Sequence, residues 1–190
     1  MVTLESERLI LRQFRENDLD TFYHFSADPK VGPNSGWKPH ESRSESNQIL
    51  KAYILGGDMW AVTEKLTGHL IGSIGFRNDE KRAAPGVKSL GYALAEEHWG
   101  FGYGTEASMR IIKYGFEELD LKLISIYHFP FNYRSRRVIE KCGFTYEGTL
   151  KMAGVSYDQS VHDEVCYSMT RADYIELKTR HLFSEKERSF

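Results

Sequence analysis

The hydrophobic pattern along the chain predicts many short strands and a few helices. Alternating apolar residues, or short apolar runs between turn signals, are typical of strands. They occur over residues 8–12, 59–63, 69–76, 90–95, 121–127, 144–152 and 161–170. Apolar residues at helical spacing predict helices over residues 18–28, 42–53, 105–119 and 132–142, and another from residue 171.

The order of these elements indicates the fold class. Most strands that follow one another along the chain have short connections, which favour antiparallel hairpins. Helical crossovers occur only around the fourth and fifth strands, 90–95 and 121–127. We therefore expect an α+β fold in which helices flank a mixed, mostly antiparallel sheet of about seven strands, and not a doubly wound sheet.

The chain length of 190 residues suits one domain with a sizeable core. No internal repeat, low-complexity tract or interdomain linker interrupts the pattern. We place the domain over residues 1–183 and expect the charged residues 184–190 to form a frayed tail.

The composition indicates which partners and which cellular compartment to expect for the protein. The formal net charge of −2 does not favour direct nucleic-acid binding, and no apolar run approaches the roughly 18 residues of a membrane span. The N-terminus is acidic and lacks the apolar region of a signal peptide, and Cys142 and Cys166 lack metal-ligand spacing. We expect a cytoplasmic protein with reduced thiols, no metal and no membrane partner.

The strongest chemical signal is a glycine-rich run directly before a helix, Gly100-Phe101-Gly102-Tyr103-Gly104-Thr105. Glycine adopts positive φ at little cost and lets a ligand approach the backbone. Successive amide N–H groups and the positive end of the helix dipole can then bind a pyrophosphate. A Walker A loop would end in Gly-Lys-Ser/Thr and a dinucleotide loop would read G-x-G-x-x-G, and this run does neither. The pattern alone leaves open a glycine-rich turn that binds no ligand.

The strand before this loop has one crowded face and one bare face. Large residues alternate there with Gly91, Ala93 and Ala95. A ligand can therefore approach the backbone closely along the bare face, which leads straight into the glycine loop.

Several segments, in order along the chain, resemble the GNAT N-acetyltransferase superfamily and, within it, the RimJ/RimL-like branch. They are 6–12 (SERLILR), 99–107 (WGFGYGTEA), 132–135 (NYRS), 138–144 (VIEKCGF), Glu147-Gly148, and Asp163 with Tyr167-Ser168. The combination of the glycine loop with the N-x-x-S helix start is specific, whereas the loop alone is only suggestive.

The resemblance implies acetyl-CoA as the acetyl donor, a primary amine as the acceptor, and direct transfer without a covalent enzyme intermediate. It also implies that two parallel strands, here residues 92–95 and 123–128, splay apart around the coenzyme. A backbone N–H of Leu94 or Ala95 is then expected to polarise the thioester carbonyl. The expected coenzyme contacts are Leu94, Ala95, Trp99, Gly100, Phe101, Gly102, Tyr103, Gly104, Thr105, Asn132 and Ser135.

The catalytic groups are less clearly indicated. Many members of the superfamily place a tyrosine on the helix after the asparagine as a general acid, but Ile139 stands at that position here. The branch resemblance moves this role to Ser135, near the thioester sulfur, and a solvated helix serine is the alternative. For the base that deprotonates the ammonium we consider Glu97 and, equally, a water chain. His128 is expected to be a strand-end histidine and Cys142 a packing residue.

Two other function classes stay open from the sequence. One is a GNAT-like module that binds acyl-CoA without turnover, and the other is an unrelated nucleotide-binding protein. The acceptor is not readable, because the branch acetylates protein N-termini, polyamines, amino acids and antibiotics. We expect the charged stretches 78–88 and 157–164 to rim the acceptor side of a monomer or homodimer.

Overall fold

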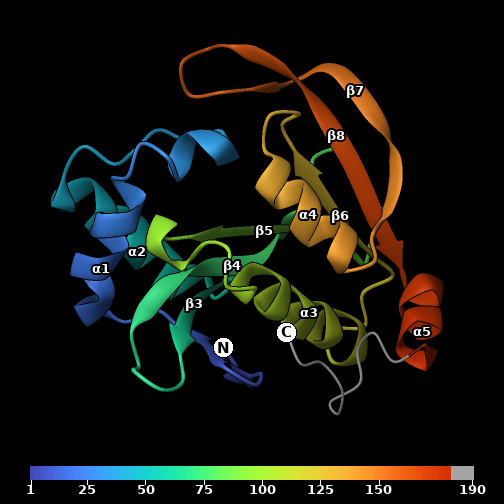
Figure 1. Ribbon diagram of the computed structural model, residues 1–190, viewed down its shortest axis with the longest axis horizontal. Coiled ribbons are helices and arrows are strands. Elements are labelled where there is room, and N and C mark those ends of the chain that lie inside the picture. Colours follow the sequence, from blue (N-terminus) through green and yellow to red (C-terminus); the bar gives the residue numbers. More distant parts are fainter. Residues whose placement is uncertain (181–190) are drawn as a thin grey trace.

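A single mixed sheet forms the centre of the molecule (Figure 1). The structure, a computed structural model, describes residues 1–180, so the expected domain end at residue 183 and the tail 184–190 lie outside the described residues. Eight strands follow the order β1-β2-β3-β4-β5-β6-β8-β7. They are β1 (Leu4–Glu5), β2 (Leu9–Gln13), β3 (Met59–Glu64), β4 (Leu70–Asn78), β5 (Val87–Leu94), β6 (Leu123–His128), β7 (Thr145–Val155) and β8 (Val161–Thr170).

The pairing of the strands confirms the expected fold class. β5 and β6 are parallel, and every other neighbouring pair is antiparallel. The additional strand β1 was not predicted, because its two residues are too few to show a period. β7 and β8 form a long hairpin that arches beyond the rest of the sheet (Figure 1).

Within residues 1–180, five α-helices and three 3₁₀ helices complete the fold. They are α1 (Leu19–Ser26), α2 (Arg43–Gly56), α3 (Tyr103–Glu117), α4 (Tyr133–Lys141) and α5 (Arg171–Thr179), with η1 (Glu16–Asp18), η2 (Gly32–Ser35) and η3 (Glu96–His98). Ser42 begins α2 as expected, because its hydroxyl accepts the N–H of Glu45 at 3.1 Å.

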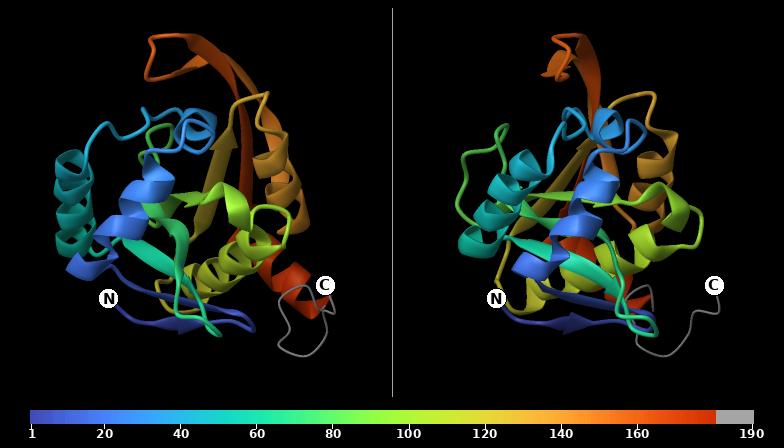
Figure 2. Two further views of the ribbon diagram at one scale, coloured as in Figure 1. Left: turned by 60° about the vertical axis from the view of Figure 1, so that its left-hand side comes forward. Right: turned by 90° about the vertical axis from the view of Figure 1, so that its left-hand side faces the viewer.

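Two hydrophobic cores lie on the two faces of the sheet. The core under α3 includes Ile74, Phe76, Leu90, Ile111 and Phe116. The core under α1 and α2 includes Phe14, Phe22, Phe25, Leu50 and Met59. The two views in Figure 2 show the resulting layers, with α1 and α2 on one side of the sheet and α3 and α4 on the other.

The parallel pair β5–β6 is joined over only a short distance. Val87, Lys88 and Ser89 pair with residues 123–125, and beyond them the strands diverge (Figure 1). Residues 90–94 of β5 continue to pair with β4, and the end of β6 continues to pair with β8. The divergence therefore opens a gap inside the sheet, between two strands that are each held from the outer side.

The connection between β4 and β5 is shorter than predicted, and it is mostly exposed apart from the buried Asp79. We expected an exposed charged loop over 78–88, but β4 extends to Asn78 and β5 begins at Val87. Asp79 is 7% exposed, and its carboxylate accepts hydrogen bonds from Ser125 and Tyr127 of β6 and from Arg82. A charged stretch indicates exposure on average, but it does not reveal that one carboxylate has its partners on a distant strand.

Three further observations concern membrane-spanning helices, metal ligands and the two cysteines. No helix within residues 1–180 is long and apolar enough to cross a membrane. In the same range, no group of three or more His, Cys, Asp or Glu side chains is placed to hold a metal ion. Cys142 and Cys166 are both buried and carry free thiols.

Two leucines of α2 test the core beneath this helix. Leu50 is fully buried, whereas Leu55 is 86% exposed. We predict that Leu50→Ala lowers the free energy of unfolding by about 2–5 kcal/mol, because it removes buried methyl groups and leaves a cavity. Leu55→Ala removes the same atoms and should change that free energy by less than about 0.5 kcal/mol. Urea denaturation measures both, and similar losses would contradict the placement of α2.

Candidate active site

The glycine loop before α3 adopts a conformation that requires glycine. Gly100 and Gly102 have φ angles of +86° and +84°, in the left-handed region. Gly102 is the N-cap of α3, so no side chain caps the helix, and the amides of its first turn are open to an external acceptor. This arrangement explains why α3 begins at Tyr103, earlier than the hydrophobic pattern predicts.

Residues from the start of the chain hold this loop in shape. Arg8 donates from Nη1 to the carbonyl oxygen of Phe101 at 2.9 Å and forms an ion pair through Nε with Glu106 at 2.7 Å. Glu106 is 6% exposed and also accepts hydrogen bonds from the Ser6 hydroxyl and the Arg8 amide, both at 2.7 Å. The start of the chain therefore braces the loop through Ser6 and Arg8.

Two cavities meet at the gap between β5 and β6. The loop groove, about 310 Å³, lies between the glycine loop, the end of β5 and α4. The central chamber, about 510 Å³, lies between α1, α2 and the open face of β4, β5 and β6. Residues from three segments line both cavities: Asn34, Ser35, Tyr92, Ala93, Asn132 and Ser135. A ligand in the loop groove can therefore present one end to the central chamber.

Most of the expected coenzyme contacts come together around the loop groove. They are Leu94, Trp99, Gly100, Gly102, Tyr103, Gly104, Thr105, Asn132 and Ser135. Phe101 and Ala95 do not line it. Phe101 is 61% exposed, stacks on Tyr103 and contributes its carbonyl to Arg8, and Ala95 is buried in the core beneath α1.

The two amides that we considered for polarising the thioester carbonyl, those of Leu94 and Ala95, point to opposite sides of β5. The Ala95 N–H donates to the Ile71 carbonyl of β4 at 2.9 Å and is therefore already occupied. Because successive amides of a strand point to opposite sides, the Leu94 N–H points into the gap. The indole of Trp99 donates to the Leu94 carbonyl at 2.8 Å, which fixes this ring beside the groove.

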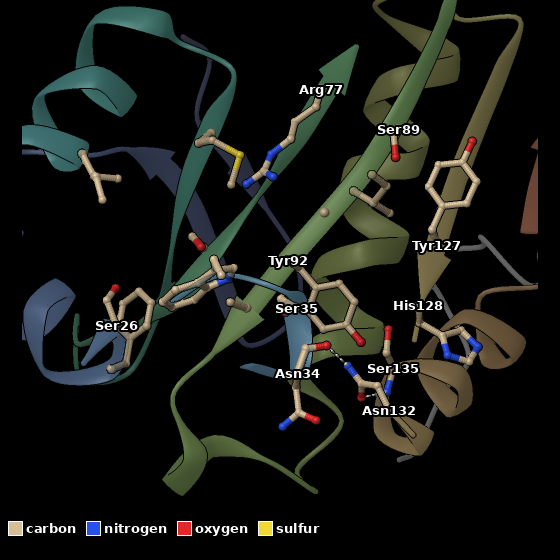
Figure 3. A pocket seen from close by; sticks show the side chains of 18 of the residues that line it. Ser26, Asn34, Ser35, Arg77, Ser89, Tyr92, Tyr127, His128, Asn132 and Ser135 are labelled. Carbon is tan, nitrogen blue, oxygen red and sulfur yellow. Dashed lines mark hydrogen bonds between the residues drawn. The ribbon is translucent and has the colours of Figure 1, made fainter. Parts of the chain in front are cut away.

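Hydrogen bonds of Asn132 join the start of α4 to the η2 segment beside the gap (Figure 3). Asn132 caps α4 as expected, because its Oδ1 accepts the Ser135 N–H at 3.0 Å, and its Nδ2 donates to the Asn34 carbonyl at 2.8 Å. The hydroxyl of Tyr92, on β5, points toward Ser135, on α4 (Figure 3), and both residues line both cavities. Burial raises the pKa of Tyr92 well above its usual value, so the phenol stays protonated at neutral pH.

The remaining sequence candidates lie elsewhere. The carboxylate of Glu97 is about half exposed, lies 3.7 Å from His24 of α1, and is not among the groups that line the two cavities. His128 lines the central chamber, but its Nδ1 is bonded to the Phe129 carbonyl at 2.7 Å and its ring points away from Tyr92 (Figure 3). Burial lowers the pKa of His128, which keeps it neutral. Cys142 is fully buried in the core under α3.

Sequence reasoning missed two parts of this site. Tyr92 was assigned only to the crowded face of its strand, and no local pattern indicates that it meets Ser135. Arg134, Arg137 and Lys141 of α4 also line the loop groove. Their helical spacing on one face was a signal that could have revealed a basic wall beside an anionic ligand.

The residues of the groove fit a coenzyme that carries phosphates and an amide-containing arm. Open amides at the start of α3 and three cations of α4 suit phosphate oxygens. The unpaired edge of β5 suits amide groups, because it presents N–H and C=O groups to the gap. A Cβ at Gly104 would lie 3.4 Å from both Tyr92 and Val138, so glycine also keeps the passage between β5 and α4 open.

The sequence and the fold have counterparts among known proteins. Residues 8–145 match the family described as "Acetyltransferase (GNAT) domain". "Uncharacterized N-acetyltransferase YoaA" of Bacillus subtilis (strain 168) is 30% identical over 174 residues, which cover 85% of this chain and 96% of that protein.

Two solved structures show the same architecture. The GNAT-family acetyltransferase of Bacillus anthracis superposes with a TM-score of 0.79 at 24% identity, covering 90% of this chain and 99% of that chain. RimJ of Mycobacterium smegmatis, in complex with CoA-disulfide, gives 0.76 at 21% identity and covers 95% of each chain.

These matches define the class of the protein as an acetyltransferase. The chain belongs to the GNAT acetyltransferase family, as the sequence resemblance indicated. Members of this family use acetyl-CoA, and a RimJ is among the proteins that share the fold.

A matched pair of glycine substitutions tests the loop. Gly102→Val forces a branched side chain into positive φ, and its Cβ would lie 3.3 Å from Arg8 Nη2. We predict that it raises the dissociation constant for CoA at least about tenfold, or about 1.4 kcal/mol. Gly57→Val imposes a similar backbone strain at the end of α2, where φ is +66° and no atom lies within 4 Å. It should leave CoA affinity unchanged, as measured by calorimetry on the folded variants.

Proposed function

We propose that the chain is an acetyl-CoA-dependent N-acetyltransferase that moves the acetyl group directly to a primary amine. One observation carries this proposal: the loop groove and the central chamber share the residues at the gap. A donor held in the groove and an amine held in the chamber would then meet at Tyr92 and Ser135. A module that only binds acyl-CoA has no need of the second cavity.

The groove residues divide the binding of acetyl-CoA among them. Amides of the glycine loop and of the first turn of α3 hold the pyrophosphate. The open edge of β5 hydrogen-bonds the pantetheine arm as a neighbouring strand would. When bound, acetyl-CoA supplies an activated thioester carbonyl with a thiolate leaving group. The Leu94 N–H donates to that carbonyl oxygen and stabilises the negative charge that develops on it.

The hydroxyl pair across the gap serves the leaving group. As the amine nitrogen bonds to the carbonyl carbon, the carbon–sulfur bond breaks and sulfur gains negative charge. Ser135 donates a hydrogen bond to that sulfur, and the phenol of Tyr92, which lies beside Ser135 and stays protonated, supports the serine hydroxyl. Tyr92 thus provides, from β5, a phenol that many superfamily members carry on the helix, where Ile139 stands here.

Proton removal from the acceptor ammonium is assigned to water in the central chamber. Glu97, the other candidate, has its carboxylate on the exposed side of η3 beside His24. A water chain needs polar groups along its path. The chamber supplies Ser26, Ser73, Ser89 and His40.

A thiol-release assay with a panel of amines tests the function. We expect free CoA to appear with at least one primary amine and the matching N-acetyl product in the mass spectrum. We also expect acetyl-CoA to raise the melting temperature more than ATP or NAD does, because only the ligand that binds the native state stabilises it. CoA binding without thiol release for any amine would favour a non-catalytic module. Equal stabilisation by NAD would favour a nucleotide-binding protein.

A double-mutant cycle tests the hydroxyl pair. We predict that Ser135→Ala lowers kcat by about tenfold to a hundredfold. The KM for acetyl-CoA should change little, because this hydrogen bond strengthens only as sulfur gains charge. Tyr92→Phe should lower kcat less, and adding it to Ser135→Ala should cost almost nothing more, since the phenol acts through the serine. Tyr146→Phe, on the exposed part of β7, is the control. Fully additive losses in kcat would show that the two hydroxyls act independently of each other.

A further inference from the structure

Small residues form part of the floor of the central chamber. Ser73 of β4 and Ser89, Gly91 and Ala93 of β5 line it from the sheet. Arg77, near the end of β4, also lines the chamber, and Figure 3 shows its side chain extending from the strand into the cavity. A long cationic side chain on a floor of small residues is available to whatever occupies the chamber.

Arg77 is also the one charged side chain of this lining that the described protein leaves without a partner. Within residues 1–180 it makes no hydrogen bond, ion pair or ring contact. The other charged lining residues are engaged by protein groups: Lys38 with Glu41, Glu45 with the Glu41 amide, and Glu164 with Lys81. The chamber therefore offers an occupant one positive charge that no described protein group engages.

The walls of the chamber are apolar and aromatic. Phe22, Phe25, Trp37, Tyr53 and Phe129 line it from α1, α2 and the loops. Such walls favour a ligand whose middle part is apolar, with polar groups at its ends.

The strand register gives the distance between those ends. Arg77 pairs with Ser89, whereas Ala93, which borders the gap, pairs with Ser73. At about 3.3 Å per residue, the stretch of β5 from Ser89 to Ala93 spans about 13 Å. In a free α-amino acid the amine and carboxylate share one carbon and cannot reach both places. A three-residue peptide spans up to about 10 Å and can do so once the arginine side chain extends toward it.

We propose that the acceptor is an amine whose far end carries a carboxylate, and that Arg77 binds this carboxylate while the amine lies at the gap. A short peptide with a free C-terminus has this form. The inference rests on the proposed function and adds the chemical class of the acceptor. A guanidinium binds a carboxylate with two parallel hydrogen bonds, which fixes orientation as well as affinity. A polyamine would instead bring a second ammonium toward Arg77, and like charges disfavour it.

Two peptides that differ only in terminal charge test the proposal. They are Ala-Phe-Ala with a free C-terminal carboxylate and the same peptide with a C-terminal amide. Calorimetry with CoA present gives their affinities without requiring turnover, and thiol release from acetyl-CoA gives their KM values. We expect the wild-type protein to bind the carboxylate form at least about tenfold more tightly.

Variants at Arg77 assign the preference to this side chain. Arg77→Gln should weaken binding of the carboxylate form to the level of the amide form and leave the amide form unchanged. Arg77→Lys should keep part of the preference, because it keeps the charge but loses the two-pronged geometry. Arg15→Gln makes the same charge change at an exposed position outside the chamber and should behave as wild type.

The outcomes separate this inference from the proposed function. Equal affinities of the wild-type protein for both peptides, or no binding of either, would overturn the carboxylate-bearing acceptor. Thiol release with equal KM values would do the same while leaving the acetyltransferase standing. Absence of thiol release with every amine would count against the acetyltransferase alone, since calorimetry judges the carboxylate preference separately.

Discussion

The active site depends on the interruption of the parallel pairing between β5 and β6. Three residues at the start of each strand pair, and the strands then separate while β4 and β8 hold them from outside. The separation leaves backbone N–H and C=O groups facing a gap within the sheet, and such groups are costly when buried without partners. Trp99 takes the Leu94 carbonyl, and an extended ligand with amides of its own can take the remaining groups. Missing strand pairing thus creates a binding site.

The rest of the site is arranged around the two sides of this gap. On the side of α3 and α4, the glycine loop and a basic helix face suit an anionic donor. On the side of α1 and α2, aromatic walls and a bare floor suit an acceptor with an apolar body. The two environments meet at the residues that line both cavities, among them Tyr92, Asn132 and Ser135. Donor and acceptor can therefore be selected by different surfaces and still meet at one point.

The fold could be predicted from the sequence because strand and helix periods are local signals. The glycine loop and the Asn132 cap are also local, and the structure places both where the sequence indicates. The buried Asp79 and the contact of Tyr92 with Ser135 could not be predicted, since each joins elements that are distant along the chain. Glu97 shows the converse. Its position near the end of β5 suggested a base, but the turn of η3 directs the carboxylate toward His24 and solvent. The direction in which a side chain points just after a strand depends on the turn that follows the strand.

The contacts of Arg8 with the glycine loop and Glu106 affect the order in which the protein folds. The Arg8–Glu106 ion pair and the bond to the Phe101 carbonyl join residues that lie 98 and 93 positions apart in the sequence. Contacts of such long range form slowly, because a large loop of chain must close first. On the ribosome, the N-terminal segment leaves the tunnel first but cannot complete its contacts until the start of α3 has been synthesised. The glycine loop therefore reaches its final shape only after two distant parts of the chain have met, and fraying of the first strands would loosen the coenzyme loop in the mature protein.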